Sequence, residues 1–307
     1  MRKMNLILTA AVILLASVSC GQQREVPESL AGVKDLVARL DSAVTAMYGW
    51  EPTDSTYNHS IDTLIFDIMD EYESERPDAD TGERGEFAIQ QKAYDEARVT
   101  WAEFKRLCDA DRYEEALDFY LGEGDGHIKK NEGDFLVFLK HSTQRFVFFS
   151  QVLLPMMREY KGDSFATDKY IDLLQLEKAM EDTSIALSAE TTGYVPEVYP
   201  YVIQELGYAL VSTGKMDEAQ NLFSDLTSAI YGLTGDALFA NFYGTQFCAR
   251  LYLEDGKPDW ALATWDDFRD YLKEHSSDYD ADDLSECIDR IEEEKAGISA
   301  SAPMKTE

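Results

Sequence analysis

Apolar residues recur along this chain at spacings of three and four. One series runs through Leu30, Val33, Val37, Leu40, Val44 and Met47. Similar series follow in 61–72, 87–108, 113–120 and 170–187. This spacing places apolar side chains on one face of a helix. Because no segment shows the alternation of a strand, the pattern predicts an all-α protein of about eleven helices joined by short loops.

The most apolar internal stretch runs from Phe135 to Tyr160, and it contains the uncharged core FVFFSQVLLPMM, at 146–157. This core lies between Arg145 and Arg158 and is too short for the ~20 residues that a membrane-spanning helix needs. We therefore expect a buried helix here. Pro155 is expected to kink or end it, because proline lacks the backbone N–H of a helix interior.

Two segments share a pattern at a constant offset of 42 residues, YVIQELGYALVSTGKMDEAQNLFSDL from Tyr201 and YGTQFCARLYLEDGKPDWALATWDDF from Tyr243. The pairs that coincide are Tyr201 with Tyr243, Gln204 with Gln246, Gly214-Lys215 with Gly256-Lys257, Ala219 with Ala261, and Phe223 with Trp265. Each unit predicts a helix, a turn at glycine and a second helix. The alanine allows the two helices to approach closely, and the aromatic residue fills the space beside it.

This pattern resembles the tetratricopeptide repeat. The first unit carries Leu206-Gly207 in its first helix and lacks the closing proline, and the second has Cys248-Ala249 at the corresponding place. A weaker third unit begins at Trp101, with a turn that we expect to be one residue shorter. The resemblance implies a right-handed solenoid of helical hairpins.

The resemblance also implies a concave groove lined by the first helix of each unit. The candidate groove residues are Tyr201, Gln204, Tyr208, Tyr243, Gln246 and Arg250. Tyrosine and arginine combine contact area with a polar tip, as binding anchors do. The alternative is that these side chains pack between neighbouring helices. The Lys/Asn/Arg clamp with which some family members hold acidic C-terminal peptides has no counterpart here, so a different ligand type is implied.

The first residues have the order of a secretory signal. Arg2 and Lys3 precede an apolar run, and Ser17-Val18-Ser19 leads to Cys20. This resembles a bacterial lipoprotein signal in which Cys20 is acylated and becomes the first mature residue. Ordinary secretion is the alternative. Gly21, rather than Asp, follows the cysteine, which favours the outer membrane of a Gram-negative cell.

The expected organisation follows from these patterns. It is a signal peptide at 1–19, the lipidated cysteine and a tether at 20–27, a helical-repeat domain at 28–296 and a flexible tail at 297–307.

The chain is strongly acidic, with a formal net charge of −31. Loss of Arg2 and Lys3 with the signal lowers this by two, to −33. Nucleic-acid binding depends on basic residues at phosphates, so this class of partner is excluded. Anionic headgroups should also repel the protein, which leaves the lipid as its means of membrane attachment.

No catalytic motif, cofactor fingerprint or metal-ligand spacing is present, so we expect no enzyme, no cofactor and no metal site. The histidines are scattered, at His59, His127, His141 and His275. After Cys20 the cysteines are Cys108, Cys248 and Cys287, and whether two of them form a disulfide stays open.

These observations favour a non-catalytic envelope scaffold that binds a protein or peptide. The alternative is a lipoprotein that captures glycans or nutrients beside an outer-membrane transporter, as starch-utilisation lipoproteins do.

Overall fold

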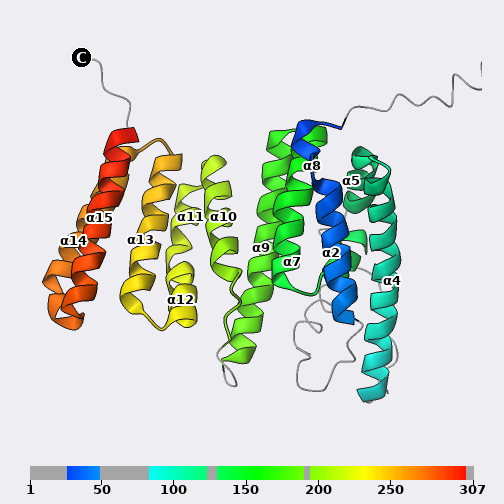
Figure 1. Cartoon of the computed structure of the whole chain (residues 1–307), viewed down its shortest axis with the longest axis horizontal. Coiled ribbons are helices and arrows are strands. Elements are labelled where there is room, and N and C mark those ends of the chain that lie inside the picture. Colours follow the sequence, from blue (N-terminus) through cyan, green and yellow to red (C-terminus); the bar gives the residue numbers. More distant parts are fainter. Residues whose placement is uncertain (1–25, 49–82, 123–129, 190–193, 302–307) are drawn as a thin grey trace, which may run out of the picture. The chain divides into compact units, whose positions relative to one another are not determined.

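A computed structural model describes residues 26–48, 83–122, 130–189 and 194–301 of the 307-residue chain (Figure 1). In these ranges every regular element is a helix, and no strand occurs. A π-helical segment joins α7 to α8 and a single residue separates α11 from α12, so the thirteen α-helical segments amount to eleven separate helices. The expected all-α class and helix number are confirmed.

The chain divides by its internal contacts into two units, Met1–Gly32 and Val33–Glu307. The described part of the first unit contains one turn of 3-10 helix, η1 (Glu28–Leu30), in which the Leu30 amide donates to the Pro27 carbonyl at 2.9 Å. The signal peptide and Cys20 lie outside the described residues.

The first half of the second unit contains α2 (Val33–Tyr48), α4 (Glu83–Asp109), α5 (Tyr113–Leu121), α6 (Lys130–Phe138), α7 (Ser142–Val147), the π-helical η2 (Phe148–Leu153), α8 (Leu154–Lys161) and α9 (Asp163–Ser188). The second half contains α10 (Tyr199–Ser212), α11 (Met216–Asn221), α12 (Phe223–Thr234), α13 (Ala237–Glu254), α14 (Pro258–Glu274), the 3-10 turn η3 (Ser276–Asp278) and α15 (Ala281–Ser301). The predicted stripe at 61–72 lies outside the described ranges.

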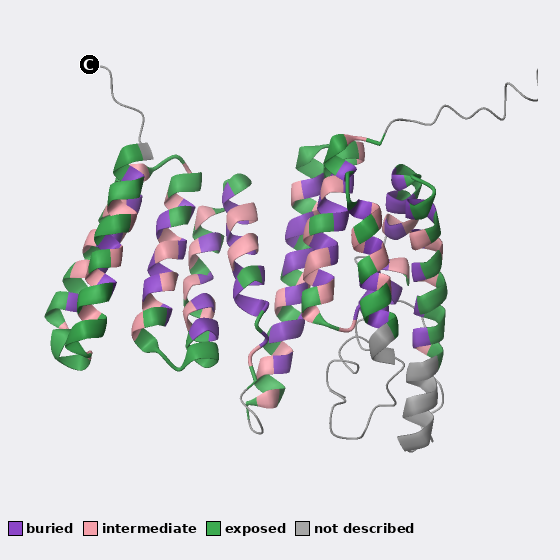
Figure 2. Ribbon diagram, viewed as in Figure 1, coloured by how far each residue is buried: buried purple, intermediate pink, exposed green. Residues whose placement is uncertain are grey.

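Helices of the second half pack mainly on their neighbours in sequence. Helix α10 contacts α9, α11, α12 and α13, while α13 contacts α12, α14 and α15. Buried and exposed positions accordingly alternate around each helix (Figure 2). Helix α15 continues to Ser301, past residue 296 where the sequence predicts the domain to end, and Ile298 is buried in the core that α15 shares with α13 and α14.

Three helical hairpins turn in the same way. Gly214 and Gly256 have the positive φ angles of 78° and 71° that glycine adopts at little cost, and the amides of the lysines that follow donate to carbonyls five residues back. In the third unit Asp111 adopts a φ of 55°, and the Arg112 amide donates to the Leu107 carbonyl at 2.9 Å. The third turn is therefore as long as the other two, and the expectation that it is one residue shorter was wrong. The equivalence of this turn to the other two is not evident in the sequence, because Asp111 stands where the other units have glycine.

Each of the three hairpins buries its small residue completely. Ala116, Ala219 and Ala261 have no exposed surface. Each stands four residues beyond the cation that follows the turn. A larger side chain at these places would push the two helices apart.

Close approach also occurs between successive units. A Cβ atom at Gly207 of α10 would lie 2.5 Å from the ring of Phe247 of α13. At Gly244 of α13 it would lie 2.5 Å from the Thr227 hydroxyl and 2.8 Å from the Phe223 ring, both of α12. Glycine is required at these two positions because real Cβ contacts are longer.

The first half of the second unit is held by a cluster of aromatic rings. Trp101 and Phe104 of α4 meet Phe135 of α6 and Phe148 of η2, with centroid separations of 5.1 to 5.7 Å between the helices. Tyr120 of α5 completes the cluster at 5.0 Å from Phe135. Most of these pairs are edge-on or tilted, as the ring quadrupoles favour.

The predicted buried helix at 146–157 is present, with a feature that the sequence did not indicate. Its middle, Phe148–Leu153, is π-helical, and Pro155 stands in the first turn of α8. The wider π-helical turn changes the hydrogen-bond register just before the residue that has no N–H. The helix therefore continues through Pro155 to Lys161.

Arg145 of α7 is buried together with two glutamates of α9. Its Nε and Nη2 donate to both oxygens of Glu177 at 2.7 and 2.9 Å, and Nη2 also donates to Glu181 at 3.3 Å. Nη1 donates to the carbonyls of Leu139 and Lys140, just beyond the end of α6. All five N–H groups are used, so the guanidinium joins α7 and α9 to the end of α6. Loss of one partner would leave an uncompensated charge in the core.

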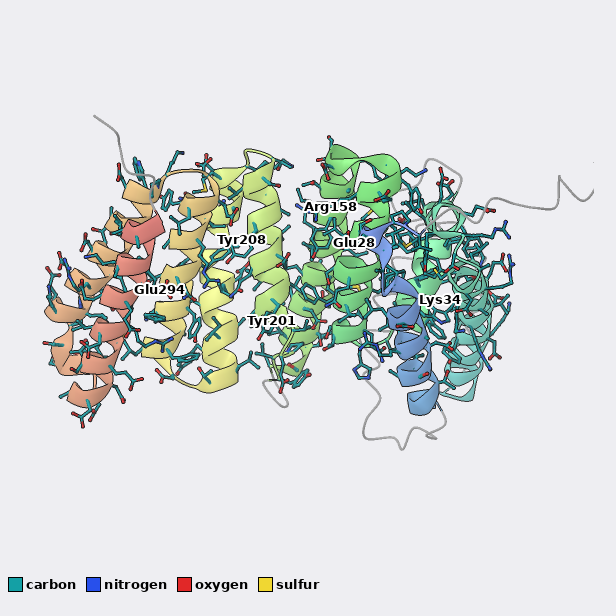
Figure 3. The ribbon with its side chains drawn as sticks, turned by 45° about the horizontal axis from the view of Figure 1, so that its top comes forward. Glu28, Lys34, Arg158, Tyr201, Tyr208 and Glu294 are labelled. Atoms are coloured by element: carbon teal, nitrogen blue, oxygen red, sulfur yellow. The ribbon has the colours of Figure 1, made fainter. Side chains whose placement is uncertain are left out.

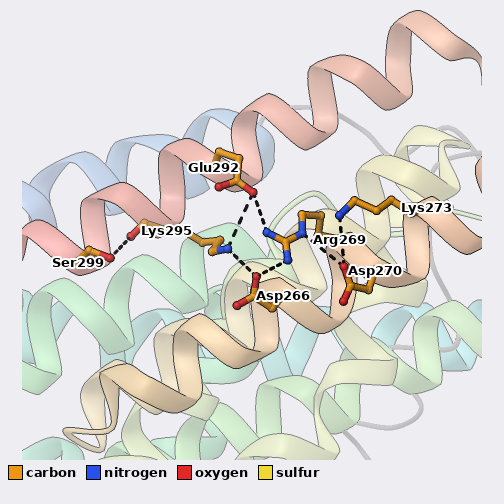
Figure 4. Close-up of polar contacts among 7 residues, drawn as sticks. All are labelled: Asp266, Arg269, Asp270, Lys273, Glu292, Lys295 and Ser299. Atoms are coloured by element: carbon orange, nitrogen blue, oxygen red, sulfur yellow. Dashed lines mark hydrogen bonds and ion pairs between the residues drawn. The ribbon is translucent and has the colours of Figure 1, made fainter.

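Ion pairs hold α15 against α14. Lys295 lies 2.5 Å from Asp266, and Arg269 lies 3.1 Å from Glu292 and 2.7 Å from Asp266 (Figure 4). The lysine and arginine side chains are mostly covered while the acids are more exposed, so this network is a partly screened surface link.

We predict that Ala219→Leu destabilises the domain by about 1–3 kcal/mol, because the added volume overpacks a fully buried crossing. Chemical denaturation followed by circular dichroism measures this. The control is Ala237→Leu at an exposed position of α13, which should change stability by less than about 0.5 kcal/mol. Equal stability of the two variants would contradict the assignment of Ala219 to a crossing.

A second prediction concerns pH. Burial and, next, the Glu177 carboxylate raise the pKa of Glu181 to about 7. A carboxyl that binds its proton more tightly when folded stabilises the fold at low pH, and this contribution is lost as the pH rises through about 7. Between roughly pH 4.5, the ordinary pKa of a glutamate, and pH 7.5 the wild type should therefore lose unfolding free energy relative to Glu181→Gln. Glu197→Gln, at an exposed position, should follow the wild type, and a parallel course for all three proteins would contradict the prediction.

Candidate functional site

Three of the candidate groove residues lie on α10. Tyr201 is 60% exposed, and Gln204 and Tyr208 are half-buried. They stand on one side of the helix because spacings of three and four residues share a face, and the opposite side is buried through Val202, Ile203, Leu206 and Leu210. The apolar stripe of α10 thus turns this polar face away from the core.

Tyr208 and Arg250 are brought together across two helices. The Tyr208 ring lies 6.0 Å from that of Phe247 on α13, one turn before Arg250. Burial raises the pKa of the Tyr208 hydroxyl, while the guanidinium of Arg250, which also hydrogen-bonds to it, opposes the rise. Arg250 is exposed and forms no ion pair with a described residue.

The two remaining candidates face α15. Gln246 donates to the Glu294 carboxylate at 2.6 Å, and the Tyr243 hydroxyl accepts from Arg290 at 3.3 Å. Figure 3 labels Tyr201 and Tyr208 on α10 and Glu294 on α15. Tyr243 and Gln246 are half-buried, so a part of each side chain is engaged by the last helix. Matched positions in the two units therefore have different neighbours.

The structure adds residues that the sequence did not indicate. Glu205 of α10 is half-buried, and its raised pKa results from burial, against the lowering effects of Tyr170 on α9 and Arg158 on α8. The Arg158 side chain is 57% exposed, and its ion pair with Asp163 is long, at 4.0 Å. A polar row therefore runs from Arg158 through Glu205 and Tyr208 to Arg250. Nothing in the local sequence around Arg158 marks it as part of this row, since its neighbours there come from distant helices.

The thiols carry no sign of nucleophilic chemistry. Cys108, Cys248 and Cys287 are unpaired. Burial raises the pKa of Cys108 to about 12 and those of Cys248 and Cys287 to about 11. Thiolates are the reactive form, so these cysteines behave as small apolar side chains.

The described histidines have structural surroundings. The His141 pKa is lowered by burial and by Arg145, and His275 stacks on Tyr271 at 4.2 Å. His59 and His127 lie outside the described residues. Among the residues that the structure describes, no group of His, Cys, Asp and Glu side chains is arranged to hold a metal ion, and no helix has the length and apolarity to cross a membrane.

Comparisons of this chain with protein families, with curated proteins and with solved structures find no match.

Proposed function

We propose that the protein is an envelope lipoprotein, anchored in the outer membrane through Cys20, whose helical domain is a non-catalytic scaffold for a protein or peptide partner. The proposed arrangement is a right-handed solenoid of hairpins in which α10 and α13 contribute to a binding groove. Support comes from the three matched turns and from the buried alanines at 116, 219 and 261.

The observation that carries the binding proposal is the exposed face of α10 with its neighbour on α13. Tyr201 and Tyr208 stand two turns apart on one side of α10, and Arg250 reaches Tyr208. Tyrosine and arginine are the residues that dominate protein interfaces, because a large ring or guanidinium ends in a polar group. Tyr243 and Gln246 are hydrogen-bonded to residues of α15, so they are less exposed than Tyr201 and form the edge of this surface.

We predict that the double variant Tyr201→Ala, Arg250→Ala lowers partner capture at least tenfold, since loss of two anchors costs ~2 kcal/mol or more. The measurement is a quantitative pull-down of envelope extract with the full-length protein. The variant should remain folded, because both side chains are exposed.

The matched control is Tyr231→Ala, Arg39→Ala, which removes an exposed tyrosine and an exposed arginine from helices α12 and α2. It should capture the partner as the wild type does. Equal loss in both double variants would mean that α10 and α13 do not form the binding surface.

The lipid anchor gives a separate prediction. Cys20→Ala should move the protein from the membrane fraction to the soluble fraction and remove the mass of the acyl chains, because the proposed attachment is the lipid and anionic headgroups repel an acidic chain. Cys248→Ala is the control and should stay with the membrane. Unchanged fractionation and mass of the Cys20 variant would overturn the anchor.

A second candidate function, glycan capture, has one observation in its favour. The Trp260 side chain is 61% exposed, and its ring lies 5.8 Å from that of Tyr252, whose hydroxyl accepts from Gln220 at 2.7 Å. An exposed ring beside a hydrogen-bonding amide suits the apolar face and hydroxyls of a sugar. Binding of oligosaccharides that Trp260→Ala abolishes would favour this function over a protein partner.

A further inference from the structure

A cavity of about 250 Å³ opens between α5, α6 and α9, and its lining residues all come from these three helices. The residues of its wall that matter here are Glu132, Leu136, Lys169, Asp172, Leu173 and Leu176. Small-molecule sites typically combine an apolar wall with a few convergent polar groups, and this lining has the same composition.

A largely buried ion pair forms part of the cavity wall. The Lys169 Nζ lies 2.6 Å from the Glu132 Oε1, and the two side chains are only 18% and 5% exposed. Removing such a pair from water costs free energy that the attraction between the charges only partly returns. Its position beside an open cavity leaves the ammonium, which has three N–H donors, able to donate to a ligand as well.

Asp172 adds a second carboxylate. It stands three residues after Lys169 on α9, so both side chains lie on the same face of the helix. It is exposed and forms no hydrogen bond or ion pair with any described residue. The cavity therefore presents one cation next to a carboxylate that is free to accept hydrogen bonds.

We propose that this cavity binds a small aliphatic zwitterion of the amino-acid class. The ligand carboxylate accepts from the Lys169 ammonium, its ammonium donates to Asp172 and Glu132, and its side chain lies against Leu136, Leu173 and Leu176. The hydrogen bonds are charge-assisted and point in opposite directions, so the site recognises the two ligand charges together.

Size and charge argue against large ligands and against anions. Pockets for drug-sized molecules measure ~300–1,000 Å³, so this cavity takes something smaller. The field of a chain with a net charge of −31 disfavours an anion, whereas a zwitterion is neutral overall.

Isothermal titration calorimetry of the full-length protein tests the proposal, with L-leucine as the probe. Two analogues each lack one charge, 3-methylbutylamine without the carboxylate and 4-methylpentanoate without the amine. Leucine should bind, and each analogue should bind at least about tenfold more weakly, the loss expected for a charge-assisted hydrogen bond. Absence of leucine binding at millimolar concentration would overturn the proposal and leave the ion pair a link between α6 and α9.

Variants locate the site. Asp172→Asn should weaken leucine binding about three- to tenfold, because an exposed carboxylate is partly screened. Asp168→Asn makes the same charge change at an exposed position of α9 outside the cavity, and it should leave the affinity unchanged. Leucine binding that is equally strong in both variants, or equally weakened, would place the ligand elsewhere and contradict the proposal.

Discussion

Close approach of helices at small residues is the constraint on which the hairpins of this protein depend. Ala116, Ala219 and Ala261 have no exposed surface, and each follows a turn that contains one left-handed residue. The turn sets where the second helix starts, and the alanine sets how near it can come to the first. An aromatic residue stands four positions after each alanine, and Tyr120 and Trp265 are buried there while Phe223 is half-buried.

The helices and the hairpin turns could be predicted from the sequence because they depend on residues close together in the chain. Helical periodicity and the Gly-Lys turns predicted the all-α class, the number of helices and the hairpins. Asp111 was harder, since a left-handed aspartate is uncommon and its turn can be aligned in two ways. The trio of Arg145, Glu177 and Glu181 could not be predicted, because isolated charged residues on a helix indicate a solvated face and only the packing of α7 on α9 buries them.

The candidate groove shows the same limit. An offset of 42 residues predicts which positions correspond in two units, but it contains no information on what lies beyond the last unit. Helix α15 packs on α13, so Gln246 bonds to Glu294 while Tyr201, at the other matched tyrosine position, remains mostly exposed. Correspondence in sequence therefore gives equivalent places on a helix, and the neighbouring helix decides whether a side chain there is available to a partner.

The surroundings of the basic side chains distinguish the two proposed binding surfaces from the rest of this acidic protein. The chain has 59 acidic and 28 basic residues, and most of the basic side chains that the structure describes are engaged by nearby carboxylates, as Lys295 is by Asp266. Arg250 instead meets the hydroxyl of Tyr208, whereas Lys169 is paired with the Glu132 carboxylate but lies beside a cavity. A cation kept in place by burial or by an aromatic neighbour loses little conformational freedom when a ligand arrives. For this reason the binding surfaces proposed above are placed at Arg250 and Lys169, where a basic residue is held beside open surface.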